Sequence, residues 1–464
     1  MTFSPRKFQE QAVARHAYLL THGNPKGRRA SLEASVAGFG KTYVASFVAK
    51  QMGAPMAVLC PKAVIPHWEQ AAEDVGVPIT FVTNYEQPRI IVPHKWRSKR
   101  TAHGKQSANM TEINRIKAAK EVSFPHGKWL VRGKRYQWLV TPPTLMVFDE
   151  VHRCKSSKTQ NAKLLQAASA QNIPTLMMSA TTAENPMDLY MAGYALGLHD
   201  GADFLSWASQ YGVRPDGFGF EFKGSRKDLA RLNDELFPSF GHRKTFDEIP
   251  GFPDTQIDLY PVSDDGAAQK FDKIFEKVAE LEEKSQEAIA AVTQRLRARQ
   301  ISELCKVPAI AELVQESVLA GNSAVVFLNF TESITQLLRQ LKAIASQVCT
   351  VQGGQNPKFR EQAIQDFQKD LAHVLVCQIS AGGVGISLHD TRGNRPRETF
   401  ISPPDNARDL IQALGRVRRD GAKSPSIQHI MYLKGSVEER VRRSVERKVH
   451  NISLLNDGDL DPLF

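Results

Sequence analysis

The chain has 464 residues, of which 42% are hydrophobic and 23% charged, so its composition excludes neither an enzyme nor a binding module. Lysine and arginine number 60 against 49 acidic residues, and the resulting net charge of +11 favours polyanionic partners such as nucleic acid. The five cysteines lie far apart without a CxxC pair, which excludes the usual ligand spacing of zinc and iron–sulfur sites. No stretch has the roughly 18 apolar residues of a membrane span, and the N-terminus has no signal-peptide core, so we expect a cytosolic protein without membrane contact.

Short apolar runs alternate with helical patterns along both halves of the chain. Runs of this length, bounded by turn signals, predict buried parallel strands in an α/β sheet. The first series comprises Pro55–Cys60, Ile79–Val82, Thr144–Phe148 and Thr175–Met178. The second comprises Ala324–Leu328, Gln347–Val351, His373–Cys377, Glu398–Ile401 and Ile427–Leu433. The chain is therefore expected to build the same kind of sheet twice.

A segment that disfavours regular structure separates the two series. It reads Ile249-Pro250-Gly251-Phe252-Pro253, and two prolines with a glycine disfavour both helix and central strand. We place the domain boundary there, which gives a first domain of residues 1–250 and a second of residues 251–464. Beyond the boundary, apolar residues at helical spacing predict a long amphipathic helix over about residues 264–304 that packs on the second domain. These residues are Phe271, Ile274, Phe275, Val278 and Leu281.

Residues 87–140 form a basic insertion in the first domain. The insertion has thirteen lysines and arginines but only two acidic residues, Glu112 and Glu121, and aromatic residues are interleaved with the basic ones. The aromatic residues are Trp96, Trp129, Tyr136 and Trp138. Two interpretations have equal weight. The basic residues could follow a nucleic-acid phosphate backbone while the aromatic residues stack on bases, or the segment could be a solvated insertion that its aromatic residues pin to the first domain.

A glycine-rich loop precedes a helical run near the N-terminus. The loop reads Ala37-Gly38-Phe39-Gly40-Lys41-Thr42, and the helical run is Tyr43–Met52. Glycines let backbone amides turn toward phosphates at a helix start, Lys41 can reach the β- and γ-phosphates, and the Thr42 hydroxyl can bind Mg²⁺. Ser35 stands where the full GxxxxGK[ST] pattern has its first glycine. The loop predicts a site for ATP with Mg²⁺.

Two adjacent carboxylates follow the apolar run that ends at Phe148. At the carboxyl end of a strand, Asp149 can hold hydrated Mg²⁺ while Glu150 orients and deprotonates an attacking water. Such a pair is often only a solvated turn. Its position about a hundred residues after a phosphate loop favours the catalytic interpretation.

With further segments in order, the chain resembles the superfamily 2 helicases and translocases over nearly its whole length. The segments are Arg6-Lys7-Phe8-Gln9 before the phosphate loop, Gly38–Thr42 as motif I, Asp149–His152 as a DExH motif II, Ser179-Ala180-Thr181 as motif III, Ala381–Leu388 as motif V and Gln412–Arg419 as motif VI. The resemblance implies an α/β fold of two tandem RecA-like domains, with parallel sheets flanked by helices and the insertion in the first.

The resemblance also implies roles for individual residues. Nucleotide contacts are expected from Gln9, which would read adenine, and from Gly38, Phe39, Gly40, Lys41, Thr42 and Gln412. Catalytic roles are expected for Lys41, Asp149, Glu150, Arg416 and Arg419, with the two arginines as fingers on the γ-phosphate. His152, Ser179, Ala180 and Thr181 would couple hydrolysis to nucleic-acid grip, and Lys62, Ser380, Gly382 and Gly383 would contact nucleic-acid phosphates. Thr42 and Asp149 would be the Mg²⁺ ligands.

Within that superfamily the chain is most similar to the Swi/Snf-like group and to compact helicases of bacteriophages. The similarity rests on Val58–Lys62 followed by Trp68, on Tyr85-Glu86, and on Asp149–Lys155, which resembles DEAHRxK. One departure is Arg419-Asp420-Gly421-Ala422, where that group usually has RxGQ, so a chromatin remodeller is not indicated.

The leading hypothesis is a monomeric, nucleic-acid-stimulated ATPase that moves along DNA. Single-stranded, forked or branched DNA would be its partner, with replication or recombination proteins as further candidates, and the cytoplasm of a host cell its location if a phage encodes it. Two alternatives remain: an RNA helicase, because DExH motifs occur in both classes, and a nucleotide-switched clamp that binds nucleic acid without moving.

Overall fold

The computed structural model describes residues 3–88, 120–124, 127–132, 135–156, 159–217, 219–246, 248–250, 254–263, 288–382, 386–419 and 421–457. These residues form two compact units; the first holds most residues up to 245, and the second most residues from 246 to 453. No helix in the described part of the chain combines the length and apolar character needed to cross a membrane.

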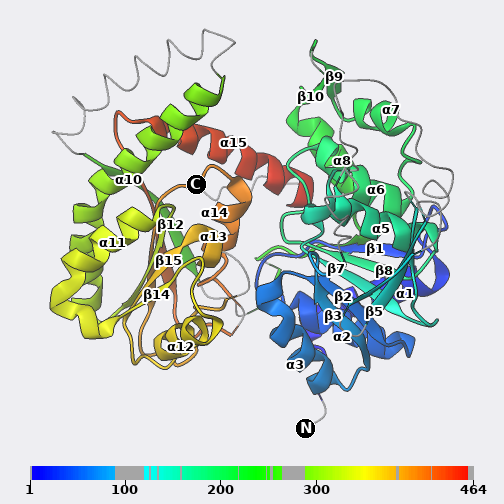
Figure 1. The fold of residues 1–464 in the computed structure, drawn as a ribbon, viewed down its shortest axis with the longest axis horizontal. Coiled ribbons are helices and arrows are strands. Elements are labelled where there is room, and N and C mark those ends of the chain that lie inside the picture. Colours follow the sequence, from blue (N-terminus) through cyan, green and yellow to red (C-terminus); the bar gives the residue numbers. More distant parts are fainter. Residues whose placement is uncertain are drawn as a thin grey trace, which may run out of the picture. The chain divides into compact units, whose positions relative to one another are not determined.

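The first unit contains a parallel sheet of six strands in the order β11-β1-β8-β7-β2-β3 (Figure 1). The strands are β1 (Ala30–Glu33), β2 (Met56–Cys60), β3 (Ile79–Asn84), β7 (Leu145–Asp149), β8 (Thr175–Met178) and β11 (Gly241–His242). The first four predicted runs are confirmed as β2, β3, β7 and β8. β1 and β11 were not predicted, because β1 is short and ends on Glu33, and β11 has only two residues.

Helices surround the sheet of the first unit. They are α1 (Lys7–His22), α2 (Lys41–Met52), α3 (Ile65–Val75), α5 (Gln160–Ala170), α6 (Tyr190–Leu196), α7 (Phe204–Ser209) and α8 (Arg226–Leu236), with short 3-10 turns η1 (Lys62–Val64), η3 (Val151–Cys154) and η4 (Pro186–Leu189). A small antiparallel pair joins β9 (Val213–Pro215) and β10 (Phe220–Phe222). α2 begins directly after Gly40 and ends at Gly53, whose left-handed backbone at φ +62° terminates the helix. α1 packs against α2 and β1, so both ends of the loop are fixed by packed elements.

The described part of the basic insertion is an antiparallel sheet of three strands. They are β4 (Lys120–Phe124), β5 (Gly127–Arg132) and β6 (Arg135–Trp138). Trp138 is buried, stacks on Phe81 with 5.8 Å between ring centroids, and donates from Nε1 to the Leu164 carbonyl oxygen at 2.9 Å. For Trp138 the interpretation as a base-stacking residue is therefore wrong, because its ring is part of the core. Trp96 lies outside the described residues, as do the side chains of Trp129, Tyr136 and the basic residues from 89 to 135.

The second unit repeats the architecture with a parallel sheet in the order β12-β17-β16-β13-β15-β14. Its strands are β12 (Thr255–Val262), β13 (Ser323–Leu328), β14 (Val348–Val351), β15 (Val374–Gln378), β16 (Arg397–Ile401) and β17 (Ser426–Leu433). The five predicted runs are confirmed, and β12 is an additional strand. Its weak apolar signal reflects a half-exposed position beside β17.

Two apolar layers cover the two faces of the second sheet. The helices are α10 (Ala288–Leu319), α11 (Thr331–Gln340), α12 (Pro357–Gln368), α13 (Ile379–Gly382), α14 (Ala407–Leu414) and α15 (Val437–Asp457), with the 3-10 segment η5 (Leu341–Gln347). Val325 and Phe327 of β13 pack with residues of α14 and α15, whereas Val326 and Leu328 pack with α10 and α11. The alternation follows from the two-residue period of a strand. The fold is therefore two tandem RecA-like domains, each with a parallel sheet between helices.

The predicted amphipathic helix falls only partly on described residues. The residues on which it was predicted, Phe271 to Leu281, lie outside the described part. The described helix α10 begins at Ala288, continues to Leu319 beyond the predicted end, and packs on the second unit's sheet.

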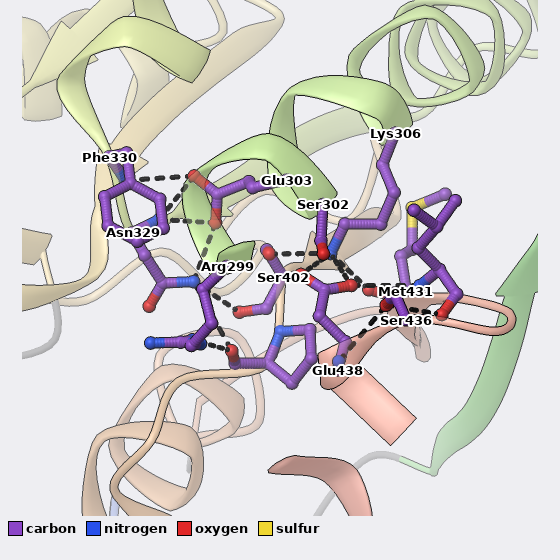
Figure 2. A network of polar contacts seen from close by, with 12 residues as sticks. Arg299, Ser302, Glu303, Lys306, Asn329, Phe330, Ser402, Met431, Ser436 and Glu438 are labelled. Carbon is purple, nitrogen blue, oxygen red and sulfur yellow. Dashed lines mark hydrogen bonds and ion pairs between the residues drawn. The ribbon is translucent and has the colours of Figure 1, made fainter. Parts of the chain in front are cut away.

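A buried polar network ties α10 to loops at the carboxyl edge of the second sheet (Figure 2). The Lys306 ammonium, which has no exposed surface, donates to Ser402 Oγ, to the Met431 carbonyl oxygen and to the Glu438 carboxylate at 2.8 Å each. Glu303, one turn earlier, accepts from the backbone amide of Asn329. These bonds satisfy buried charges that would otherwise be costly, and they fix the loops that follow β13, β16 and β17.

Candidate nucleotide-binding site

The glycine-rich loop connects β1 to α2 in the first unit. Gly40 has φ +82°, a backbone conformation that favours glycine, and a Cβ at this position would lie 2.5 Å from Gln9 Nε2, so the Gln9 side chain would have to move. Gln9 is itself held by the Arg6 backbone amide, which donates to its Oε1 at 3.1 Å. Gln9 therefore lies against the loop that holds Gly38, Phe39 and Gly40, and its contact with adenine stays a prediction.

Lys41 is held by the loop that it follows. Its Nζ donates to the carbonyl oxygens of Ser35 at 2.7 Å and Val36 at 2.9 Å. Burial lowers the pKa of Lys41 to about 8, while Glu33 and then Glu150 act in the opposite direction. The ammonium is thus mostly protonated at neutral pH and sits at the start of α2, where helix amides and the helix dipole favour an anion.

The acidic pair lies at the carboxyl end of β7. Asp149 Oδ2 accepts from Trp68 Nε1 at 3.1 Å, and the Asp149 carbonyl oxygen accepts from Tyr85 Oη at 2.7 Å. Burial, followed by the neighbouring charge of Glu150, raises the pKa of the Asp149 carboxyl. A cation bound here would favour its charged form. Glu150 has a left-handed backbone at φ +54°, which is uncommon outside glycine.

Motif III and motif II are joined by hydrogen bonds around Glu150. Ser179 Oγ donates to Glu150 Oε2 at 3.2 Å and lies 3.1 Å from His152 Nδ1. The Thr181 backbone amide donates to the same hydroxyl at 3.2 Å. The Ala180 carbonyl oxygen accepts from Arg243 Nη1 at 3.4 Å. Of the predicted coupling residues, Ser179 and His152 thus contact Glu150 directly, and Thr181 is linked to it through Ser179.

In the second unit, motifs V and VI are also bonded to each other. Arg416 is buried and donates from Nη1 to the Ile386 carbonyl oxygen at 3.2 Å, while its own carbonyl oxygen accepts from the Leu388 amide at 2.9 Å. Arg419 donates from Nη1 to Ser387 Oγ at 2.6 Å. Gln412 lies on α14 immediately before this segment. The two arginines are therefore oriented by motif V within the second unit.

The predicted phosphate contacts lie on different segments. Lys62 is exposed in η1, directly after β2, and Ser380 is exposed in α13, directly after β15. Gly382 ends α13, and Gly383 lies outside the described residues. Both described polar side chains thus follow the carboxyl ends of strands, where open α/β sheets bind their ligands.

Known protein families match both halves of the chain. The family described as the res subunit of type III restriction enzymes matches residues 2–184, and the helicase conserved C-terminal domain matches residues 305–421. A protein of Acanthamoeba polyphaga mimivirus, named as an ATP-dependent RNA helicase, is 32% identical over 452 residues, which are 93% of this chain and 80% of the relative. This chain belongs to the superfamily 2 helicases. It is accordingly an ATP-dependent nucleic-acid helicase.

More distant similarities extend to other helicases. The ATP-dependent helicase fft3 of Schizosaccharomyces pombe is 26% identical over 145 residues, which are 31% of this chain and 15% of the relative. Among solved structures, Saccharomyces cerevisiae Dbp5 bound to RNA and ADP BeF3 has a TM-score of 0.48 at 12% identity, covering 97% of this chain and 88% of that one. The Sulfolobus solfataricus SWI2/SNF2 ATPase core in complex with dsDNA has a TM-score of 0.37 at 17% identity, covering 99% and 94%.

The first unit of this helicase has donors suited to ATP and Mg²⁺. The Asp149 carboxylate and the Thr42 hydroxyl are hard oxygen ligands of the kind that Mg²⁺ prefers, and the buried Asp149 carboxyl lacks a cationic hydrogen-bond partner among the contacts described above. The Lys41 ammonium and the start of α2 supply positive charge for phosphates. These residues therefore fit ATP with Mg²⁺, which the helicase family implies.

Several residues that support this helicase site were not predicted from the sequence. Glu33, His16 and His242 are buried behind the phosphate loop, and both histidines are bonded to Glu33. Tyr85 and Trp68 were noted only for their similarity to motifs, not as supports of Asp149. The one available signal was an acidic residue, Glu33, at the end of a short apolar run that leads into the loop.

Proposed function

We propose that this helicase uses ATP hydrolysis to move along DNA, acting on forked or branched DNA in replication, recombination or repair. The observation that carries the proposal is the hydrogen-bonded cluster of Glu150, Ser179 and His152 beside Asp149 in the first unit. A clamp that only binds the nucleotide needs a phosphate loop but no general base. The cluster that orients a general base therefore favours turnover.

The nucleotide would be held by the first unit. Lys41 and the amides at the start of α2 would bind the phosphates, Gln9 would read adenine, and Gln412 would add a further nucleotide contact. Thr42 and Asp149 hold Mg²⁺, which when bound neutralises phosphate charge and helps align the γ-phosphate.

Glu150 is the proposed general base. Its Oε2 accepts from Ser179, which orients the carboxylate that would position water and accept its proton. His152 contacts both Glu150 and Ser179, so a change at the γ-phosphate would reach motif III through one or two hydrogen bonds.

Arg416 and Arg419 are the proposed arginine fingers. Positive charge on the γ-phosphate is the main contribution that a protein makes to phosphoryl transfer. Because Arg419 is bonded to Ser387 of motif V, the grip of Ser380, Gly382 and Gly383 on nucleic acid would respond to the state of the nucleotide.

The DNA preference is supported by the Swi/Snf-like segments, namely Pro61-Lys62 with Trp68, Tyr85-Glu86, and the DExH run from Asp149 to Lys155. A compact phage-type enzyme of that group is the finer identity that we propose. RNA is the second candidate, because the mimivirus relative is named as an RNA helicase.

An ATPase and strand-displacement panel tests the proposal. Duplex, forked, branched and single-stranded DNA are compared with RNA of matched sequence and length. The proposal expects the highest ATPase stimulation with forked or branched DNA. Stimulation by RNA alone would establish the second candidate, and binding without turnover on any substrate would establish a clamp.

A further inference from the structure

A buried carboxylate lies directly behind the phosphate loop. Glu33 ends β1 and has no exposed surface. Its Oε2 is 2.8 Å from His16 Nε2 of α1 and 3.2 Å from His242 Nδ1 of β11. Its Oε1 accepts from the backbone amide of Ser35 at 2.8 Å. One carboxylate therefore joins α1, β1 and β11 to the first residues of the loop.

The connection continues from Ser35 to the phosphate-binding lysine. The Ser35 hydroxyl lies 3.3 Å from His242 Nδ1 and accepts from the Lys244 amide at 3.0 Å. The Ser35 carbonyl oxygen accepts from Lys41 Nζ at 2.7 Å. Ser35 is thus held on its amide, hydroxyl and carbonyl groups, and two of these four contacts are made by Glu33 and its partner His242.

The distances around His16 fit a neutral imidazole. His16 Nδ1 lies 2.7 Å from Ser31 Oγ, so a neutral imidazole with its proton on Nε2 donates to Glu33 and accepts from Ser31. Burial lowers the pKa of His16, in agreement with that neutral form. Burial alone would raise the pKa of Glu33, but the bonds to His16 and His242 outweigh it and hold the pKa well below its usual range.

We propose that Glu33, oriented by His16 and His242, is a positioning residue that fixes Ser35 and thereby presets the phosphate loop and Lys41 for the triphosphate of ATP. The proposal rests on the proposed ATPase function. Glu33 does not touch the nucleotide itself. Its contribution is to hold the loop in the binding-competent geometry before ATP arrives, so the energy of binding is not spent on ordering the loop.

The same three side chains could in principle ligate a divalent metal, since their ligand atoms lie within 4.8 Å of one another. The hydrogen-bond interpretation is favoured by the distances. Separations of 2.8 and 3.2 Å between nitrogen and carboxylate oxygen are hydrogen-bond lengths, and the second nitrogen of His16 already has the Ser31 hydroxyl as its partner.

Substitutions at Glu33 and His16 test the proposal in the full-length chain. Glu33→Gln removes the charge that receives three hydrogen bonds. His16→Leu removes one donor, whereas His16→Gln keeps an amide donor near the position of Nε2. We expect Glu33→Gln and His16→Leu to raise both the KM for ATP and the Kd for a fluorescent ATP analogue about tenfold, with kcat changed less than about threefold. His16→Gln should restore most of the wild-type affinity.

The control is Glu398→Gln, which breaks another histidine–carboxylate pair, 2.9 Å from His429, in the second unit. It should leave KM near the wild-type value. Unchanged KM and Kd in folded Glu33→Gln and His16→Leu overturn the positioning role, as does a failure of His16→Gln to differ from His16→Leu. Stoichiometric zinc or another divalent metal in the purified wild-type protein, lost in Glu33→Gln, also overturns it. A wild-type protein that binds the analogue but never hydrolyses ATP contradicts the proposed function instead, while the Kd comparison still decides the role of Glu33.

Discussion

Ser179 donates a hydrogen bond of 3.2 Å to Glu150 Oε2, which places motif III in direct contact with the proposed base of motif II. The same hydroxyl accepts from the Thr181 amide and lies beside His152. A single hydroxyl therefore orients both the base and the histidine that follows it.

Ser179→Ala should lower the kcat for nucleic-acid-stimulated ATP hydrolysis about tenfold, because a hydrogen bond to a charged group is lost and Glu150 is less well oriented. The KM for ATP should change little, since Ser179 is not a proposed nucleotide contact. Ser179→Thr keeps the hydroxyl and is the matched control. Steady-state kinetics at saturating nucleic acid measure the effect, and a wild-type kcat for the alanine variant would show that the bond is not functional.

Lys41→Ala and Glu150→Gln should each abolish nucleic-acid-stimulated ATPase activity while largely sparing nucleic-acid binding. The lysine supplies phosphate charge and the glutamate accepts the proton of water, and neither group is a proposed nucleic-acid contact. ATPase assays and filter binding at fixed salt measure the two properties separately. Substantial turnover in the double variant would be incompatible with the assigned roles.

Arg419→Ala should reduce kcat by about 10³-fold or more if Arg419 acts as an arginine finger. Lys423→Ala, a few residues later in the sequence, removes a positive charge outside the motif and should leave kcat close to wild type. Single-turnover hydrolysis at saturating ATP is the measurement. Equal activity of the two variants would exclude the finger role for Arg419.

Lys306→Met should destabilise the second unit by about 3–5 kcal/mol, because it leaves the Glu438 carboxylate buried without its cation (Figure 2). Adding Glu438→Leu should recover most of that loss, since both charges are then removed. Arg443→Met, which breaks an exposed pair with Glu439, is the control and should have little effect.

Denaturant unfolding can assign this loss to the second unit. All five tryptophans, at positions 68, 96, 129, 138 and 207, precede residue 246, so tryptophan fluorescence follows the first unit while far-UV circular dichroism follows both. A shift in the circular dichroism transition without a matching fluorescence shift is expected. Wild-type stability of Lys306→Met would contradict the inferred cost of the unpaired charge.

Acid should destabilise the first unit partly through His16. Burial lowers the pKa of His16 from its usual 6.5, so the unfolded chain binds this proton more readily than the folded chain does. The stability that neutral His16 contributes is therefore fully present above pH 6.5, and it is lost as the pH falls from 6.5 toward the lower pKa of folded His16. Tryptophan-monitored unfolding at about pH 7.5 and about pH 5.5 should show a smaller loss for His16→Gln than for the wild type. An equal loss in both proteins would assign the acid sensitivity to other groups.

The sequence by itself determined the two parallel sheets and the segments of the candidate nucleotide site. Buried parallel strands are short continuous apolar runs, and the phosphate loop and acidic pair are contiguous motifs, so Lys41, Asp149 and Glu150 can be located without coordinates. Within the two parallel sheets, the strands that escaped prediction, β1, β11 and β12, are short or partly polar. Trp138 was ambiguous for a related reason, because an aromatic residue in a basic segment has the same local pattern whether it meets a base or the core.

Only the tertiary structure decided which polar groups support the site. Glu33 and its partner His242 are 209 residues apart in the sequence, and Lys306 and Glu438 are 132 residues apart. No local pattern marks such pairs, because a buried polar residue is stable only through partners that the fold brings to it. Sequence motifs thus name the groups that can do chemistry on ATP, and long-range hydrogen bonds in the folded units determine how those groups are held.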